Sequence, residues 1–243
     1  MMIWRYKPEG CTNFGDALND YLWPRLFSQD FQQRPGYFYG IGTVLGKKMP
    51  EQGPHIVFGA GLGYNGIPTP TSDWDIRFVR GPLTSRLLGE CPWITDPGIL
   101  VRSYFTRNET PSIECAFMPR WDLVSPALAE GCAKAGIHLL DPREPVDTIL
   151  ETICDTRLLL TEALHGAVCA DALRTPWISI YGSRGHEFKW KDWVASLDMI
   201  WNPIDATQFT LSWARDFAVP QLSALSVHTD RFTRICTEVE RYA

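Results

Sequence analysis

The sequence predicts an α/β protein made of two small units, each with its own parallel sheet. Short β-rich runs alternate with amphipathic stretches along the 243 residues, which is the pattern of layered α/β folds. The length suits one large domain or two small ones. The polar stretch 104–112 interrupts the alternation, so we expect one domain at 1–108 and a second at 109–243.

The first unit is predicted to open with a strand and an amphipathic helix. Apolar side chains recur at i+4 spacing from Phe14 to Leu26, which places one apolar face along a helix over 14–27. Pro82 suits the first turn of a short helix that ends near Gly89. The strands expected in this unit cover residues 2–6, 37–41, 55–59, 75–79 and 92–95.

The second unit repeats the alternation and ends in a helix. Apolar side chains from Phe232 to Val239 follow i, i+3, i+4, i+7 spacing, and we expect this last helix to pack back on the N-terminal domain. Parallel sheets bind ligands at the carboxyl ends of their strands, so the ligand cleft should lie between the two units. The strands expected here cover 113–118, 137–140, 157–160 and 177–181, and the other helices cover 124–135, 146–154 and 162–173.

Composition and charge exclude several classes of protein. The 23 basic and 28 acidic residues give a net charge of −5, which argues against a general nucleic-acid-binding surface. Seven cysteines are scattered without a CxxC pair, which predicts reduced thiols in the cytoplasm and neither a disulfide framework nor a metal site. No apolar run approaches the roughly 20 residues of a membrane span. The ten tryptophans fit a sugar site, a membrane-surface belt or a well-filled core.

Two glycine clusters follow predicted strands and invite a nucleotide-binding interpretation. Gly59, Gly61 and Gly63 lack the spacing of a dinucleotide fingerprint, and the residues after Gly63 cannot open the helix that would bind a phosphate. These glycines, like those at 40–42, are instead expected to let loops pass close over strand ends.

Asn13 and Asp16 open the first helix and allow two interpretations. Asn13 at the N-cap with Asp16 three residues later is a variant of the capping box, which satisfies free backbone amides. The same turn lies near the carboxyl end of a strand, where an amide and a carboxylate can bind a polar ligand. The spacing leaves both interpretations open.

Cationic side chains follow three other predicted strands. Arg80 and Arg120 each stand at a strand's carboxyl end, where a guanidinium can grip a carboxylate or phosphate, or can lay its stem over the core. Arg184 and Lys189 follow the strand at 177–181 among aromatic residues. They predict either an anion-binding loop at the cleft or a solvated loop.

The sharpest local pattern is Thr-Glu-Ala-Leu-His-Gly at 161–166, between a strand and a helix. With Thr161 as the cap, His165 lies in the first turns of the helix, where the positive end of the helix dipole favours a neutral imidazole. A neutral histidine can accept a proton from a hydroxyl or pass one to a substrate carbon. The alternative is a histidine that only packs or caps.

A series of short motifs runs in a defined order over about residues 11–193. They are Asn-Phe-Gly-Asp at 13–16, Gly-Ile-Gly at 40–42, Phe-Gly-Ala-Gly at 58–61, Val-Arg-Gly-Pro at 79–82, Asp-Pro-Gly at 96–98, Met-Pro-Arg-Trp-Asp at 118–122, Leu-His-Gly at 164–166, Ala-Asp-Ala at 170–172 and Phe-Lys at 188–189. In this order they resemble the polysaccharide pyruvyl transferase family, which includes ketal-pyruvate transferases of bacterial exopolysaccharide synthesis.

The resemblance implies a fold like that of the two-domain GT-B glycosyltransferases, with Rossmann-like domains on either side of a cleft. It implies transfer of the enolpyruvyl group of phosphoenolpyruvate to a sugar diol, with release of phosphate and with no cofactor or metal. The N-terminal domain would bind the acceptor and the C-terminal domain the phosphoenolpyruvate. A lipid-linked acceptor glycan would bring this cytoplasmic protein to the inner face of the cytoplasmic membrane.

Residue roles carry over onto the matching positions. His165 matches the proposed acid/base histidine of the Leu-His-Gly motif. Ala163 stands where some members have Arg or Ser, so the phosphate grip must come from other cations. The substrate-binding residues expected on this basis are Arg120, Arg184, Lys189 and Arg80 for phosphoenolpyruvate, and Asn13 and Asp16 for the acceptor.

Two other functions could use the same features. A nucleotide-sugar glycosyltransferase has the same architecture, cleft and anion donors. A non-catalytic glycan-binding subunit of an exopolysaccharide complex needs the fold and the aromatic rings, but it does not need His165 together with several cleft arginines. The presence of these residues favours an enzyme.

Overall fold

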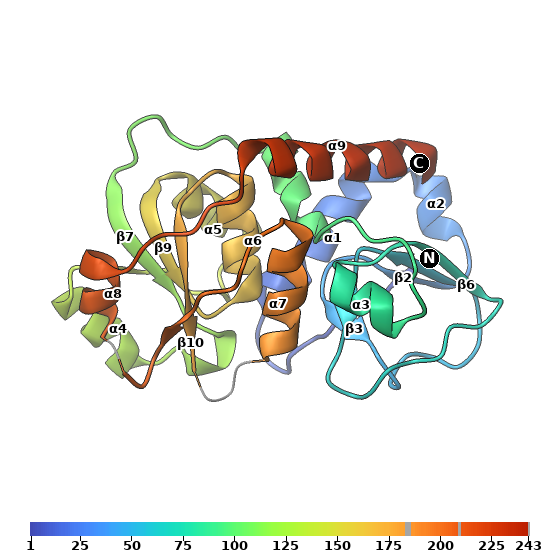
Figure 1. The fold of residues 1–243 in the computed structure, drawn as a ribbon, viewed down its shortest axis with the longest axis horizontal. Helices are drawn as coiled ribbons and strands as arrows, with labels where there is room; N and C mark the ends of the chain where they lie inside the picture. Colours follow the sequence, from blue (N-terminus) through green and yellow to red (C-terminus); the bar gives the residue numbers. More distant parts are fainter. Residues whose placement is uncertain (183–185, 209, 243) are drawn as a thin grey trace.

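Two parallel sheets form the centre of the protein in a computed structural model that describes residues 1–182, 186–208 and 210–242 (Figure 1). The first sheet has the order β1-β2-β4-β6. Its strands are β1 (Met2–Ile3), β2 (Tyr37–Tyr39), β4 (His55–Phe58) and β6 (Trp74–Phe78). The strand predicted at 92–95 is wrong: only a single bridge joins Trp93 to Val79. Pro92 explains this, because proline has no N–H for a strand ladder.

The second sheet has the order β11-β10-β9-β7-β8, and every pair in it is also parallel. Its strands are β7 (Ile113–Met118), β8 (His138–Leu139), β9 (Thr156–Thr161), β10 (Trp177–Tyr181) and β11 (Ile204–Asp205). All four strands predicted for this part of the chain are present, and β11 is an edge strand that the prediction missed. The α/β class with parallel sheets is therefore confirmed.

Helices cover the sheets and connect their strands. The helices are α1 (Phe14–Leu26), α2 (Gln29–Gln33), α3 (Pro82–Leu87), α4 (Pro126–Lys134), α5 (Val146–Cys154), α6 (Leu164–Ala172), α7 (Glu187–Ser196), α8 (Leu211–Phe217) and α9 (Leu225–Tyr242), with 3-10 turns η1 (Pro97–Ser103) and η2 (Trp121–Leu123). A separate strand pair, β3 (Thr43–Leu45) and β5 (Gly61–Leu62), lies where glycine loops were predicted. Helix α6 begins two residues later than predicted, because the Thr161 hydroxyl accepts the amide of Ala163 at 3.0 Å.

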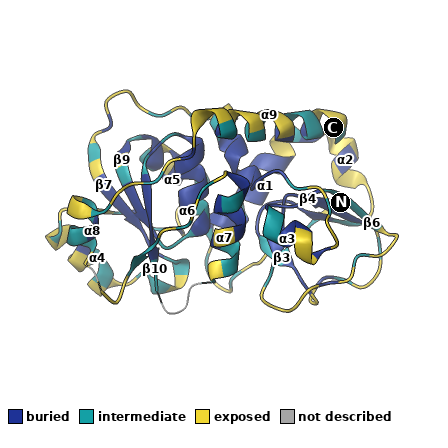
Figure 2. Ribbon diagram, in the orientation of Figure 1, coloured by how far each residue is buried: buried dark blue, intermediate teal, exposed yellow. Residues whose placement is uncertain are grey.

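A continuous apolar core runs from the first sheet to the second (Figure 2). Trp23 of α1 packs its ring against Phe27, Phe38 and Phe58 with centroids 5.0–5.7 Å apart, and each such pair contributes roughly 0.5–1.5 kcal/mol beyond its buried area. The Trp23 indole N–H donates to Asn19 Oδ1 at 2.9 Å, so this buried N–H group has a hydrogen-bond partner. Helix α1 also packs against α5 and α6, and this contact links the two sheets.

The last helix, α9, returns from the second sheet to lie against the first (Figure 1). The Tyr242 hydroxyl donates to Asp75 Oδ2 at 2.6 Å, and Arg77 pairs with Glu238 at 3.0 Å. These contacts tie the end of the chain to strand β6. The division into domains at residues 108 and 109 stays a prediction.

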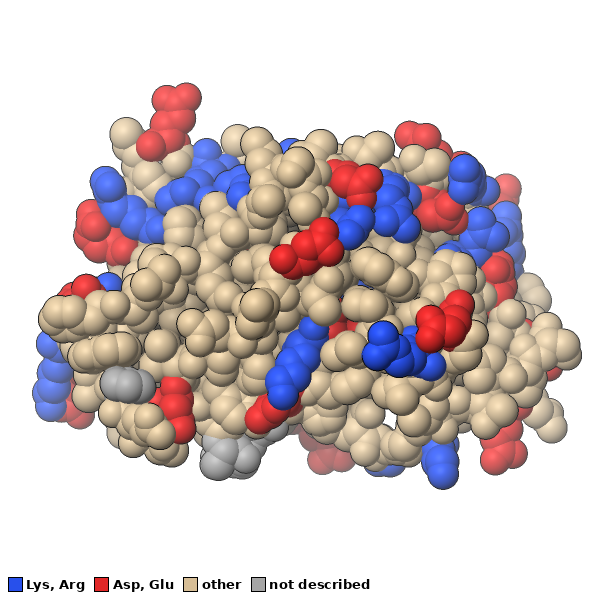
Figure 3. All heavy atoms as spheres, viewed as in Figure 1, with Lys and Arg blue, Asp and Glu red and all other residues tan. Residues whose placement is uncertain are grey.

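The surface carries charges of both signs. Figure 3 shows basic and acidic side chains interspersed over one face, in keeping with the small net charge of −5. Within the described ranges, we find no helix with the length and apolar character to cross a membrane.

Candidate active site

The carboxyl ends of both sheets face one cavity of about 650 Å³. Its wall is formed by residues that follow β1, by the first turn of α1, by the β3–β5 pair and by residues after β7, β9 and β10. This location agrees with the rule that parallel sheets bind ligands beyond the carboxyl ends of their strands. The cavity is therefore the candidate active site.

The cavity brings together most of the predicted site residues. The lining residues among them are Asn13, Asp16, Arg120, His165 and Lys189. Arg80 is not in the lining. Arg184 lies outside the described residues, so its predicted role stays a prediction.

His165 is the second residue of α6, and only 14% of its side chain is exposed. Its helix approaches the second sheet closely because residue 166 is glycine. A Cβ at Gly166 would lie 2.7 Å from both Met118 Sδ and Thr161 Oγ1, so any larger residue would push the helix off the sheet. The Leu-His-Gly motif thus has a packing function beside its histidine.

The imidazole of His165 is held between the first turn of α1 and the start of η1. A Cβ at Gly15 would lie 2.0 Å from Nδ1, so the ring occupies the space that a side chain at position 15 would need. On the other side, Nε2 lies 3.5 Å from Asp96 Oδ2, which is fully buried. Burial by itself raises the pKa of Asp96, but the attraction of His165 and Arg80 outweighs it and lowers this pKa below its usual value.

Asn13 and Asp16 do not form the capping box that one interpretation predicted. Asn13 is the N-cap residue of α1, yet its side chain caps no backbone amide. Its amide instead donates to the Asp16 carboxylate, and both residues line the cavity. Burial raises the pKa of Asp16, against the opposing effects of Asn13 and His165. A polar ligand can therefore meet an amide and a carboxylate at this wall.

Cations enter the cavity from the second sheet. Lys189, in the first turn of α7, is half-buried, and burial together with Arg80 and Arg120 lowers its pKa to about 8. Arg120 follows β7 and forms a two-pronged pair with Asp122, at 3.0 and 2.9 Å. A compact anion would meet both side chains here.

Arg80 lies behind the cavity wall and not in it. Its side chain has no exposed surface and donates to Thr43 Oγ1 at 3.0 Å and to Asp192 Oδ2 at 3.4 Å. Gly61 makes room for it, since a Cβ there would lie 2.2 Å from Nη2. We expected Arg80 to project into the cleft. Its guanidinium lies instead beside the buried carboxylates of Asp96 and Asp192, whose negative charge it neutralises.

Several lining residues were not predicted. They include Trp4, Arg5, Tyr6, Thr43, Lys48, Tyr64, Glu162 and His186. The residues at 4–6 directly follow β1, so the carboxyl-end rule applied to the first strand would have found them. His186 follows β10, as Lys189 does, but its contact with Tyr64, at 4.2 Å between ring centroids, joins distant parts of the chain and has no local signal.

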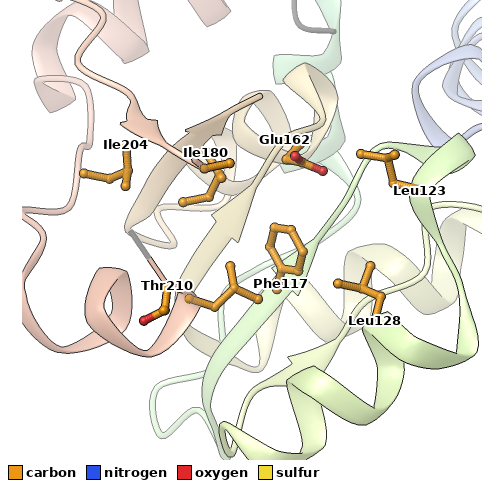
Figure 4. Close-up of a pocket in the computed structure, with 9 residues that line it drawn as sticks. Phe117, Leu123, Leu128, Glu162, Ile180, Ile204 and Thr210 are labelled. Carbon is orange, nitrogen blue, oxygen red and sulfur yellow. The ribbon is translucent and has the colours of Figure 1, made fainter. Parts of the chain in front are cut away.

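A second cavity of about 220 Å³ adjoins the first at the end of the second sheet (Figure 4). Its lining is largely apolar, with Phe117, Leu128 and Ile204 around the space shown in Figure 4. Glu162 and Ile180 line both cavities. The small cavity is thus an apolar extension beside the polar site.

Fold and site together define an α/β protein with a histidine, carboxylates and cations in one cavity at the edges of two parallel sheets. No protein-family model matches the chain. It is 34% identical over 207 residues to the succinoglycan biosynthesis protein ExoV of Rhizobium meliloti (strain 1021), an alignment that covers 79% of this chain and 63% of that protein. The chain is homologous to ExoV over this alignment, and its ordered motifs resemble those of the polysaccharide pyruvyl transferase family. It spans less than two thirds of the length of that relative.

Proposed function

We propose that the protein transfers the enolpyruvyl group of phosphoenolpyruvate to two hydroxyls of one sugar, forming a cyclic ketal and releasing phosphate. The observation that carries this proposal is the composition of the cavity. His165 sits at its wall, Lys189 and Arg120 supply positive charge, and Asn13 and Asp16 supply groups that bind hydroxyls.

The cations would bind the donor. Phosphoenolpyruvate carries a carboxylate and a phosphate close together, and such a polyanion needs positive charges and amide donors. Lys189 and Arg120 line the cavity on the side of the second sheet. Arg184, whose neighbours in sequence follow β10, is a further candidate. No cofactor takes part in this proposal.

His165 would move the protons of the reaction. The first sugar hydroxyl adds to C2 of the enol as C3 gains a proton and becomes a methyl group. The second hydroxyl then forms a bond to C2 as the C2–O bond to phosphate breaks. Of the two hydroxyl protons, one balances the proton gained at C3 and the other leaves with phosphate. A positioned imidazole contributes typically 10²–10⁴-fold to such steps.

The acceptor would lie against the first turn of α1. Asp16 can accept a hydrogen bond from a sugar hydroxyl, and Asn13 can donate one. The name of ExoV, a succinoglycan biosynthesis protein, supports a glycan of an exopolysaccharide or its lipid-linked repeat unit as acceptor. We place this reaction in the cytoplasm, at the inner face of the membrane when the acceptor is lipid-linked.

We also propose that residues 1–108 and 109–243 act as two Rossmann-like domains in a GT-B-like arrangement. Each sheet is drawn from one continuous stretch of the chain, which supports this division. Donor and acceptor would then bind to different domains.

Replacement of the cavity histidine tests the function. His165→Ala should lower the acceptor-dependent release of phosphate from phosphoenolpyruvate by at least about a hundredfold. His138→Ala is the matched control, because His138 is exposed on β8 away from the cavity. Near-normal turnover of His165→Ala would show that His165 does not transfer protons in the reaction. Turnover of UDP- or GDP-sugars in place of phosphoenolpyruvate would assign the protein to the glycosyltransferases instead.

A further inference from the structure

Two buried polar atoms face each other behind the cavity. Asp96 Oδ2 and His165 Nε2 lie 3.5 Å apart, and neither has a hydrogen-bond partner among the described residues. A buried polar atom without a hydrogen-bond partner lowers the stability of the folded protein. The pair removes both costs when Nε2 carries a proton and the two groups approach by a few tenths of an ångström.

Asp96 is fixed on its other sides. Its Oδ1 accepts the amide of Gly98 at 2.9 Å, which caps η1. Arg80 Nη1 lies 3.9 Å from Oδ2 and holds the negative charge in place. Since the carboxyl group has no exposed surface, it cannot turn away from His165 into solvent.

The buried charges continue beyond Arg80 to a second aspartate. Asp192 of α7 pairs with Arg80 and accepts the first-turn amides of α3, from Leu83 at 3.0 Å and from Thr84 at 2.9 Å. Asp192 stands one turn after Lys189 on α7. The same network therefore braces the histidine side and the lysine side of the cavity.

We propose that Asp96 is a positioning residue for His165. It accepts the Nε2 proton and so leaves Nδ1, the nitrogen beside Gly15 at the cavity wall, as the atom that exchanges protons with the substrate. A carboxylate that orients an imidazole in this way selects one tautomer and stabilises the imidazolium that forms. Asp16 of α1 is the other carboxylate that acts on the ring, and Arg80 is the cation behind Asp96. The catalytic part of this inference rests on the proposed function.

The tautomer can be read directly in the resting protein. Nitrogen-15 NMR of the histidine rings, with the His165→Ala spectrum for assignment, should show His165 protonated at Nε2 and unprotonated at Nδ1 at a pH where the ring is neutral. The opposite tautomer in the wild-type protein would overturn the proposal. This readout needs no substrate, so it stands or falls apart from the proposed function.

Asp96→Asn provides the sharper test. The amide of Gly98 still needs an oxygen acceptor, so the new NH₂ group must face Nε2 and donate to it. His165 should then switch to the tautomer with the proton on Nδ1, and kcat should fall about a hundredfold with KM for phosphoenolpyruvate little changed. An unchanged tautomer, or an unchanged kcat beside a switched tautomer, would contradict the proposal. Asp171→Asn is the matched control. Asp171 is a buried aspartate on α6, the helix of His165, but its carboxylate contacts Ser223 and Trp177 and not the histidine.

Discussion

Two buried aspartates are treated very differently by this fold. Asp171, near the end of α6, accepts hydrogen bonds from the Ser223 amide at 2.7 Å, from the Ser223 hydroxyl and from Trp177 Nε1 at 3.2 Å. Asp96, beside the start of α6, accepts only the amide of Gly98, and its second oxygen has no hydrogen bond within the described part of the chain. One carboxylate is saturated and the other is not.

The difference separates a structural role from a functional one. Two of the bonds of Asp171 join α6 to Ser223 in the segment before α9, and the third joins it to Trp177 of β10. Asp171 lines neither cavity. Asp96 directs its second oxygen at His165 of the cavity wall, and not at another segment that it would hold in place. Helix α6 is therefore tied to neighbouring segments by Asp171 near its end and carries His165, the proposed proton-transfer residue, near its start.

Gly15→Ala should give the largest effect and would sharpen the comparison at its cavity end. The added methyl group would lie 2.0 Å from His165 Nδ1, so the ring must move and lose its alignment with Asp96. Misplacement of a catalytic group by about 1 Å can cost roughly a hundredfold in rate, and we expect a loss of that size in kcat. The control is Gly131→Ala in α4, where a Cβ meets no atom within 4 Å. Full activity in Gly15→Ala would show that the ring position does not matter.

Asp171→Asn tests the other half of the comparison, the purely structural role of Asp171. The amide can keep one acceptor oxygen but not the charge, so the bonds to Ser223 and Trp177 weaken. We expect the free energy of unfolding in urea to fall by about 2 kcal/mol, because hydrogen bonds to charged groups are worth roughly 1.5–3 kcal/mol. The kcat of the variant should equal that of the wild type. A loss of activity without a loss of stability would give Asp171 a functional role too.

The elements were predictable where periodicity is strong and neighbours are regular. Strand β7 and helix α5 have the predicted bounds, because each has one clear apolar pattern and a polar segment beside it. Short elements such as β3 and β11 were missed, since two or three residues carry no period. Of the ten tryptophans, Trp4, Trp121 and Trp190 line the cavity, although Trp190 is 2% exposed and mainly fills the core.

The site was predictable only as far as single strand ends allow. His165, Arg120 and Lys189 each follow a strand, so local sequence was enough to find them. Asp96 gave no such signal, because an aspartate before Pro-Gly is also a common cap, and it does cap η1. Asp96 and His165 are 69 positions apart in the sequence, yet they lie side by side in the fold. In the same way, the buried position of Arg80 requires a residue without a side chain at Gly61. Such contacts depend on tertiary packing, which one sequence does not reveal.

Lys189→Met should give the smallest effect and extends the comparison to cations. Burial lowers the Lys189 pKa to about 8. Arg174, by contrast, donates to the Ser223 carbonyl at 2.6 Å, and an arginine keeps its charge near neutrality. Below pH 8 the ammonium attracts an anion, and above pH 8 it becomes neutral. A phosphate monoester is already doubly ionised above pH 7, since its second pKa is about 6. The affinity of the wild-type protein for phosphoenolpyruvate should therefore fall as the pH rises from 7 to 9.

Calorimetric titrations with phosphoenolpyruvate at pH 7, 8 and 9 measure this change. Lys189→Met should bind about tenfold more weakly at pH 7, a loss of about 1.4 kcal/mol, and its affinity should no longer fall across this pH range. Lys134→Met serves as the control, because Lys134 is exposed on α4 and pairs with Glu130. A wild-type affinity that stays constant from pH 7 to 9 would mean that Lys189 does not hold the donor. The positive charge would then have to come from groups that keep it at pH 9, such as Arg120.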